Sequence, residues 1–108
     1  MSELILLCKT EDVQEGVPVA VEMEGLPALA VFNVSGEYFV TEDLCSHGNA
    51  KLSDGYQDGE VIECPFHGGA FCIKTGAASA LPCVAPIRTY PVIIQDGRIC
   101  ISRQYRQS

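Results

Sequence analysis

Short apolar runs separated by turn-forming residues extend over most of the chain. Runs of four to seven residues, rich in β-branched and aromatic side chains, cover residues 4–8, 18–23, 28–34, 37–41, 60–63, 70–73, 88–94 and 98–102. Such lengths and compositions are typical of β-strands. No stretch has the period of a long amphipathic helix. The pattern therefore predicts an all-β fold.

Turn residues between these runs predict how neighbouring strands connect. Ser35-Gly36 separates two strand-like runs and indicates a compact hairpin, and Gln95-Asp96-Gly97 indicates a second hairpin near the end of the chain. The polar segment from Lys9 to Gly16 allows one helical turn, for which Thr10 is the candidate cap.

The pattern breaks in the middle of the chain. From Glu42 to Asp58 no period is sustained and Gly, Asn, Ser and Asp are frequent, so we expect a loop built around a ligand. Residues 77–86 are small and proline-rich. We therefore expect an antiparallel β-sandwich or partial barrel with a body of residues 1–41 and 84–108, which carries an insert of about residues 42–83.

Length and charge narrow the possible functions. The chain has 108 residues, which fits one domain, and its formal net charge is −7. This charge argues against binding to nucleic acid or anionic lipid, and it suits either solubility alone or steering toward basic partners. The start of the chain has no basic segment and its first apolar run is too short for a signal peptide or membrane span. We expect a cytoplasmic protein.

Both histidines of the chain are close in sequence to a cysteine. Cys45-Ser46-His47 is followed after sixteen residues by Cys64-Pro65-Phe66-His67. Thiolate and imidazole together suit zinc or an iron-sulfur cluster. Structural zinc sites usually pair like ligands at wider spacing, whereas here each pair is mixed. This spacing suits two metal ions better than one. Cys45 and Cys64 could hold one iron, and His47 and His67 the other.

The other four cysteines have no partner that the sequence identifies. Cys8, Cys72 and Cys100 lie in apolar runs, where we expect reduced thiols that pack as small hydrophobic groups. The role of Cys83, in the proline-rich segment, stays open.

The C-x-H and C-x-x-H pairs, continued by Gly68-Gly69, resemble the Rieske 2Fe-2S proteins over essentially the whole chain. The flanking residues, which are 45–50, 52–56 and 63–67, look like those of the small ferredoxins of bacterial multicomponent aromatic-ring dioxygenases. The resemblance implies a single Rieske domain with one 2Fe-2S cluster bound by Cys45, His47, Cys64 and His67. It also implies that the loop of residues 77–86 covers the cluster.

In this family such a protein is no enzyme but a one-electron carrier. The resemblance implies transient complexes with an NAD(P)H-dependent flavoprotein reductase and with a terminal Rieske oxygenase, and we expect the carrier to be a monomer. Electron transfer needs no acid-base catalyst, and the sequence offers no nucleophilic triad or phosphate loop.

Mixed ligation sets the expected range of reduction potential. Two thiolates and two neutral imidazoles leave the oxidised core near zero charge, so it accepts an electron more easily than a core with four thiolates, and Rieske centres span about −150 to +300 mV. High-potential relatives resemble this pattern but add a disulfide and hydroxyl donors beside the cluster. In this chain the positions of the disulfide cysteines are Ala50 and Phe66, and those of the hydroxyl residues are Gly69 and Phe71. Fewer donors to sulfur favour the low end of the range.

Two alternatives remain open from the sequence. One is a mononuclear zinc module that only holds two loops together. The other is a small subunit that takes part directly in an oxygenase or a reductase. A brown, reducible protein excludes zinc, and an activity assay of the isolated chain tests the second alternative.

Overall fold

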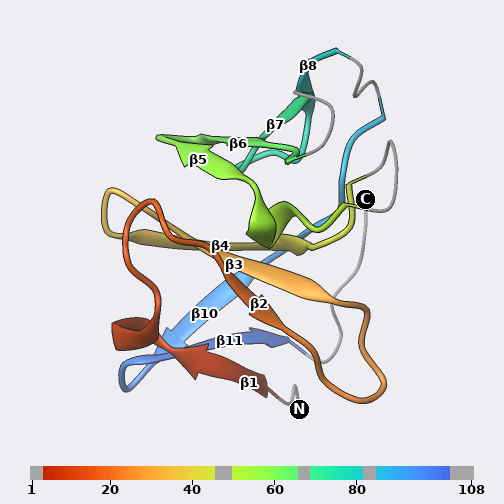
Figure 1. Ribbon diagram of the computed structural model, residues 1–108. Coiled ribbons are helices and arrows are strands. Elements are labelled where there is room, and N and C mark those ends of the chain that lie inside the picture. Colours follow the sequence, from red (N-terminus) through yellow and green to blue (C-terminus); the bar gives the residue numbers. More distant parts are fainter. Residues whose placement is uncertain (1–3, 46–49, 66–68, 82–84, 103–108) are drawn as a thin grey trace.

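The chain folds into three antiparallel β-sheets (Figure 1). The computed structural model describes residues 4–45, 50–65, 69–81 and 85–102. The strands are β1 (Leu4–Lys9), β2 (Val19–Val21), β3 (Leu29–Val34), β4 (Glu37–Glu42), β5 (Tyr56–Asp58), β6 (Val61–Glu63), β7 (Ala70–Cys72), β8 (Ala78–Ala80), β9 (Thr89–Tyr90), β10 (Val92–Gln95) and β11 (Arg98–Ser102). Two 3₁₀ turns, η1 (Thr10–Asp12) and η2 (Leu52–Asp54), complete the elements. These ranges contain no α-helix, and the all-β prediction is confirmed.

The sheets are stacked, with the second between the other two. The first has the order β1-β11-β10, the second β2-β3-β4-β9 and the third β5-β6-β7-β8. Figure 1 shows the third sheet above the second and the first below it. The architecture is an open sandwich in which no sheet closes on itself among the described strands.

Strand β3 supplies apolar side chains to both faces of the middle sheet. Leu29 and Val31 pack into a core shared with the first sheet, whereas Ala30, Phe32 and Val34 pack into a core shared with the third. Alternate side chains of a strand point to opposite faces, so a run that is apolar at successive positions fits a strand buried on both sides. The second of these cores also contains Cys45 and Cys64.

The run at residues 88–94 was expected to be one strand, and this prediction is wrong. The structure has two strands, because β9 pairs with β4 in the second sheet and β10 pairs with β11 in the first. Pro91 lies between them. Proline has no N–H to donate to a ladder, so the pairing ends there and the chain crosses to the next sheet.

Three further elements differ from the sequence prediction. η2 and β5 lie in the segment expected to be irregular, and β8 lies in the proline-rich segment expected to be a loop. Each has only three residues, so its own pattern is too short to detect, and its pairing partner determines it. The cap of η1 is Lys9, not Thr10, and the Thr10 hydroxyl instead donates a hydrogen bond to the carbonyl oxygen of Gly97 (3.2 Å).

A shared apolar core and several polar contacts hold the third sheet on the second. At its base the N–H of Glu42 donates to the carbonyl oxygen of Arg88 (2.9 Å), and the N–H of Arg88 donates to the Glu42 carboxylate (2.6 Å). Farther out, the side-chain amide of buried Gln57 in β5 donates to the carbonyl oxygen of Asn33 in β3 (2.9 Å). β5 to β8 fall within the expected insert, and its division from the body at residues 42 and 83 stays a prediction.

Candidate metal centre

Cys45 lies at the base of a loop between β4 and η2. Its N–H donates to the carbonyl oxygen of Ala50 (2.9 Å), and the neighbouring residues Leu44 and Lys51 form an antiparallel bridge. These two rungs fix where the chain leaves and returns. Cys45 is only 1% exposed. His47 belongs to the same loop in sequence and lies outside the described residues.

Cys64 occupies an equivalent position at the end of β6. Its N–H donates to the carbonyl oxygen of Gly69 (2.7 Å), immediately before β7 begins. In both loops the cysteine N–H therefore reaches the carbonyl five residues later in the chain. Cys64 is 3% exposed, and His67, inside this second loop in sequence, lies outside the described residues.

The structure brings the two cysteines into one apolar core. Both pack in the cluster formed by the second and third sheets, together with Ala50 and Leu52 of the first loop and Phe71 of β7. Thiolates in such surroundings are sheltered from water and from other reactive thiols. The expected sulfur ligands thus lie in the same core, each at the base of its loop.

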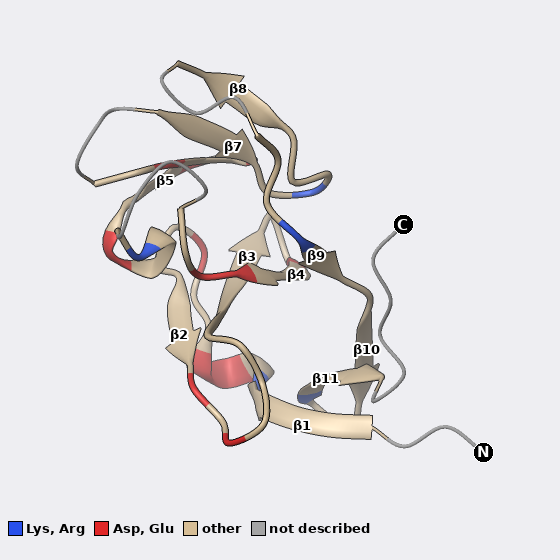
Figure 2. Cartoon of the chain, turned by 90° about the vertical axis from the view of Figure 1, so that its right-hand side faces the viewer, with Lys and Arg blue, Asp and Glu red and all other residues tan. Residues whose placement is uncertain are grey.

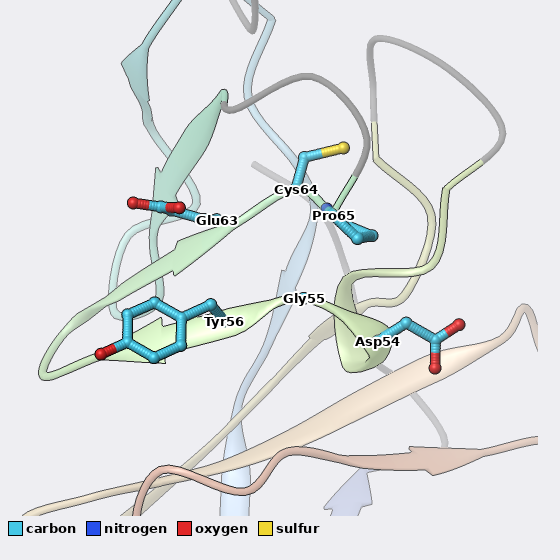
Figure 3. Close-up of a pocket in the computed structure, with 6 residues that line it drawn as sticks. All are labelled: Asp54, Gly55, Tyr56, Glu63, Cys64 and Pro65. Carbon is cyan, nitrogen blue, oxygen red and sulfur yellow. The ribbon is translucent and has the colours of Figure 1, made fainter.

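A pocket of about 300 Å³ opens beside Cys64 (Figure 3). It is lined by Asp54, Gly55, Tyr56, Glu63, Cys64 and Pro65. Figure 3 shows the Tyr56 ring and the Glu63 carboxylate side by side on paired strands, while the Cys64 thiol points away from them. Polar side chains and one candidate ligand, Cys64, thus line the pocket.

The other described cysteines are not part of this arrangement. Cys8 and Cys100 lie on the first sheet, and Cys72 lies in β7 opposite Val61. No disulfide joins any two of the described cysteines, as expected for reduced thiols. Cys83 and the middle of the segment expected to cover the cluster lie outside the described residues.

Asp43 is a buried residue that the sequence did not single out. Its carboxylate accepts hydrogen bonds from the N–H (2.7 Å) and the hydroxyl (2.8 Å) of Ser53. Burial raises the pKa of the Asp43 carboxyl, and the two Ser53 hydrogen bonds oppose this shift. Aspartate is usually exposed, and in a segment rich in turn formers nothing distinguished this one except its place two residues before Cys45.

Acidic groups dominate the surface charge around the site (Figure 2). Asp54, Tyr56 and Glu63 are exposed next to Cys64. Within the described ranges no lysine or arginine forms an ion pair with Asp54 or Glu63, whereas Lys51 pairs with Glu22 (3.0 Å). Hydrogen bonding to Glu22 raises the pKa of Lys51. The carboxylates nearest the site are available to a partner.

The donor set fits a Rieske-type centre as far as the structure describes it. Two buried cysteines of one core lie at the bases of two loops, and each loop contains one histidine in sequence. In the described part of the chain no group of three metal-binding side chains occurs. The described part of the site therefore supplies two sulfur donors. The two nitrogen donors, His47 and His67, are assigned from the sequence alone.

Comparison with known proteins agrees with this fold and donor set. The model of the Rieske [2Fe-2S] domain matches residues 3–91, and the chain belongs to this family. The ferredoxin component of the p-cumate 2,3-dioxygenase system of Pseudomonas putida is 46% identical over 102 residues, which cover 94% of this chain and 86% of the relative. The family's Rieske-type 2Fe-2S cluster is the cofactor of this chain.

Two solved structures have nearly the same fold. The ferredoxin of Sphingomonas yanoikuyae B1 is 61% identical with a TM-score of 0.92, and the match covers 94% of this chain and 99% of that one. A second match is to the complex of reduced oxygenase and oxidized ferredoxin in carbazole 1,9a-dioxygenase, at 38% identity with a TM-score of 0.90 over 97% of both chains. The Rieske fold expected from the two ligand motifs is confirmed.

Proposed function

We propose that this chain is the ferredoxin component of an aromatic-ring dioxygenase system. It takes one electron from an NAD(P)H-dependent flavoprotein reductase and passes it to a terminal Rieske oxygenase. The observation that carries the proposal is the pair of buried cysteines, each at the base of a loop that contains a histidine in sequence. Relatives named as dioxygenase ferredoxins, and a neighbour solved in complex with its oxygenase, support this role.

Four side chains are proposed to hold the cluster. Cys45 and Cys64 bind one iron through their thiolates, and His47 and His67 bind the other through neutral imidazole. The bound cluster supplies reversible one-electron chemistry. The protein keeps the two cysteine sulfurs in an apolar core and fixes their spacing through the two loop bases.

The chain itself is not an enzyme in this proposal. Its cysteines bind the cluster and no residue has to transfer a proton to a substrate, in agreement with relatives that are named ferredoxin components or subunits. The reduction potential is proposed to be low for a Rieske centre. Gly69 and Phe71 occupy the positions at which high-potential relatives have hydroxyl groups that donate hydrogen bonds to the cluster sulfurs.

The encounters with both partners are proposed to be transient and to involve a monomer in the cytoplasm. The acidic surface beside Cys64 supports the transient character of these complexes, because opposite charges on the partners speed encounters without requiring tight binding. In the residues described here, no helix has the length and apolar character needed to cross a membrane.

Electron paramagnetic resonance of the dithionite-reduced protein tests the proposal directly. Mixed nitrogen and sulfur ligation is expected to give a lower average g-value than an all-thiolate cluster, with two iron and two inorganic sulfide per chain. Reoxidation of the reduced protein by a terminal oxygenase is the functional readout. A colourless protein that contains zinc, or an isolated chain that hydroxylates an aromatic substrate by itself, would overturn the proposal.

A further inference from the structure

Asp43 is the one carboxylate that is fully buried among the described residues. Its relative exposure is 0%, whereas the neighbouring carboxylates of Glu42 and Asp54 are partly or fully exposed. Placing a carboxylate in an apolar interior is costly unless its oxygens are hydrogen-bonded. The function proposed above gives this residue no role, so its burial calls for another explanation.

Every polar group of Asp43 is used to close the base of the first loop. Its backbone N–H donates to the carbonyl oxygen of Ala28 (2.9 Å), and its backbone carbonyl oxygen accepts from the N–H of Leu52 (2.6 Å). The two carboxylate oxygens accept separately from the N–H and the hydroxyl of Ser53. Asp43 thereby joins the end of β4, the start of β3 and the turn η2.

These contacts form the lowest rung of a short ladder that leads to Cys45. Above the Asp43 rung come the bridge between Leu44 and Lys51 and then the hydrogen bond from Cys45 to Ala50. Because the rungs follow one another without a gap, a shift of Asp43 relative to η2 displaces the cysteine two residues away. The second loop has β-pairing of Ile62 with Phe71 at the same level, two residues before Cys64, and needs no such side chain.

We propose that Asp43 is a positioning residue for the cluster, and that its buried negative charge also lowers the reduction potential. This inference rests on the proposed function, because it takes Cys45 as a cluster ligand. The charge acts through an interior that screens it less than water does, since Asp43 lies beside the core that contains both cysteines. A negative charge near the cluster disfavours an added electron.

Three variants separate the charge of Asp43 from its hydrogen bonds. Asp43→Asn removes the charge and keeps an oxygen that can accept from the Ser53 N–H. Asp54→Asn is the matched control, because it removes an exposed carboxylate from the same turn. Ser53→Ala removes one hydrogen-bond donor and keeps both charges. Each is purified with its cluster and compared with the unchanged protein by redox titration, paramagnetic resonance and the rate of cluster loss.

The charge is tested by the potential. At a fixed applied potential, Asp43→Asn is expected to raise the ratio of reduced to oxidised protein about tenfold, which is 59 mV for one electron. Asp54→Asn is expected to change this ratio by less than about twofold, because water screens its charge. Equal shifts in the two variants would overturn the electrostatic part of the proposal.

The positioning role is tested by cluster retention. Ser53→Ala is expected to leave the potential nearly unchanged, to speed cluster loss several-fold and to speed exchange of the Leu52 amide hydrogen. If Asp43→Asn does not retain a cluster while Asp54→Asn does, the positioning role is supported. Loss of the cluster at the same rate in Ser53→Ala as in the unchanged protein contradicts it. Failure of the unchanged protein to bind a 2Fe-2S cluster would instead contradict the proposed function.

Discussion

Cys45 and Cys64 show how one local geometry is used twice. Each cysteine ends a paired segment, and each donates its N–H to the carbonyl that closes its loop. A backbone fixed in this way presents the sulfur in one direction before any metal arrives. The cost of ordering the ligands on binding is therefore reduced, which favours tight retention of the cluster.

The remaining described cysteines differ from one another in reactivity. A hydrogen bond from the Thr75 side chain lowers the pKa of the Cys72 thiol below its usual 9.0. Burial raises the pKa of the Cys8 thiol, and the nearby negative charge of Asp12 adds to the effect. The thiolate is the reactive form, so at a pH below both pKa values a larger fraction of Cys72 is reactive.

We therefore expect iodoacetamide to modify Cys72 before Cys8 in the cluster-loaded protein at about pH 7.5. Peptide mass spectrometry of samples taken over time measures both rates in one experiment. The difference is expected to narrow at higher pH, as the pH approaches the raised pKa of the Cys8 thiol. Faster modification of Cys8 at the lower pH would contradict the assigned order.

At the level of elements, Gly55 sets how closely η2 approaches strand β6, which ends just before Cys64. A Cβ atom on Gly55 would collide with the backbone carbonyl of Glu63 and would lie 3.1 Å from the carbonyl oxygen of Leu52. Backbone atoms cannot move aside as a flexible side chain can. Any larger residue must therefore push Glu63, and with it Cys64, away from the first loop.

Gly55→Ala is expected to destabilise the protein by about 1–3 kcal/mol, as overpacking of a core does. It should also release the cluster faster than the unchanged protein. Gly59→Ala is the matched control, because Gly59 turns the same hairpin and has nothing within 4 Å of an added Cβ. This control has a positive φ of 60° and should lose stability but keep the cluster. Denaturant unfolding and absorbance decay measure the two effects.

The sequence predicted the elements whose own residues determine them. β3 and β11 were predicted because several successive apolar side chains fit a strand, and the ligand motifs, through their resemblance to the Rieske proteins, predicted the cofactor without any structure. β5 and β8 were missed because three residues carry too little pattern and the strands depend on their partners. Asp43 was missed because burial of a single polar residue depends on tertiary packing, here on Ser53.

For the whole molecule, the net charge of −7 is the property most relevant to partners. Figure 2 shows acidic segments distributed over the molecule, in loops, in η1 and at the end of β4, with fewer basic ones between them. Two of the basic groups are already paired, since Lys74 lies 3.6 Å from Glu60 and Lys51 lies 3.0 Å from Glu22. The field that a partner meets is consequently negative.

Electron transfer to the terminal oxygenase is therefore expected to slow as salt is added. Raising the ionic strength from about 0.02 M to about 0.5 M should lower the second-order rate constant at least about threefold, because the Debye length falls well below the separation at encounter. Stopped-flow absorbance measures the rate, and sucrose at equal viscosity is the control. A rate that does not change with salt would show that the acidic surface serves solubility alone.

The pairing of Glu42 with Arg88 places the two ends of the intervening chain side by side. A segment whose two ends lie side by side can be replaced by a longer or shorter one, and the topology of the sheets next to it does not change. The cluster-binding segment could therefore be exchanged or altered in evolution while the rest of the chain keeps its fold.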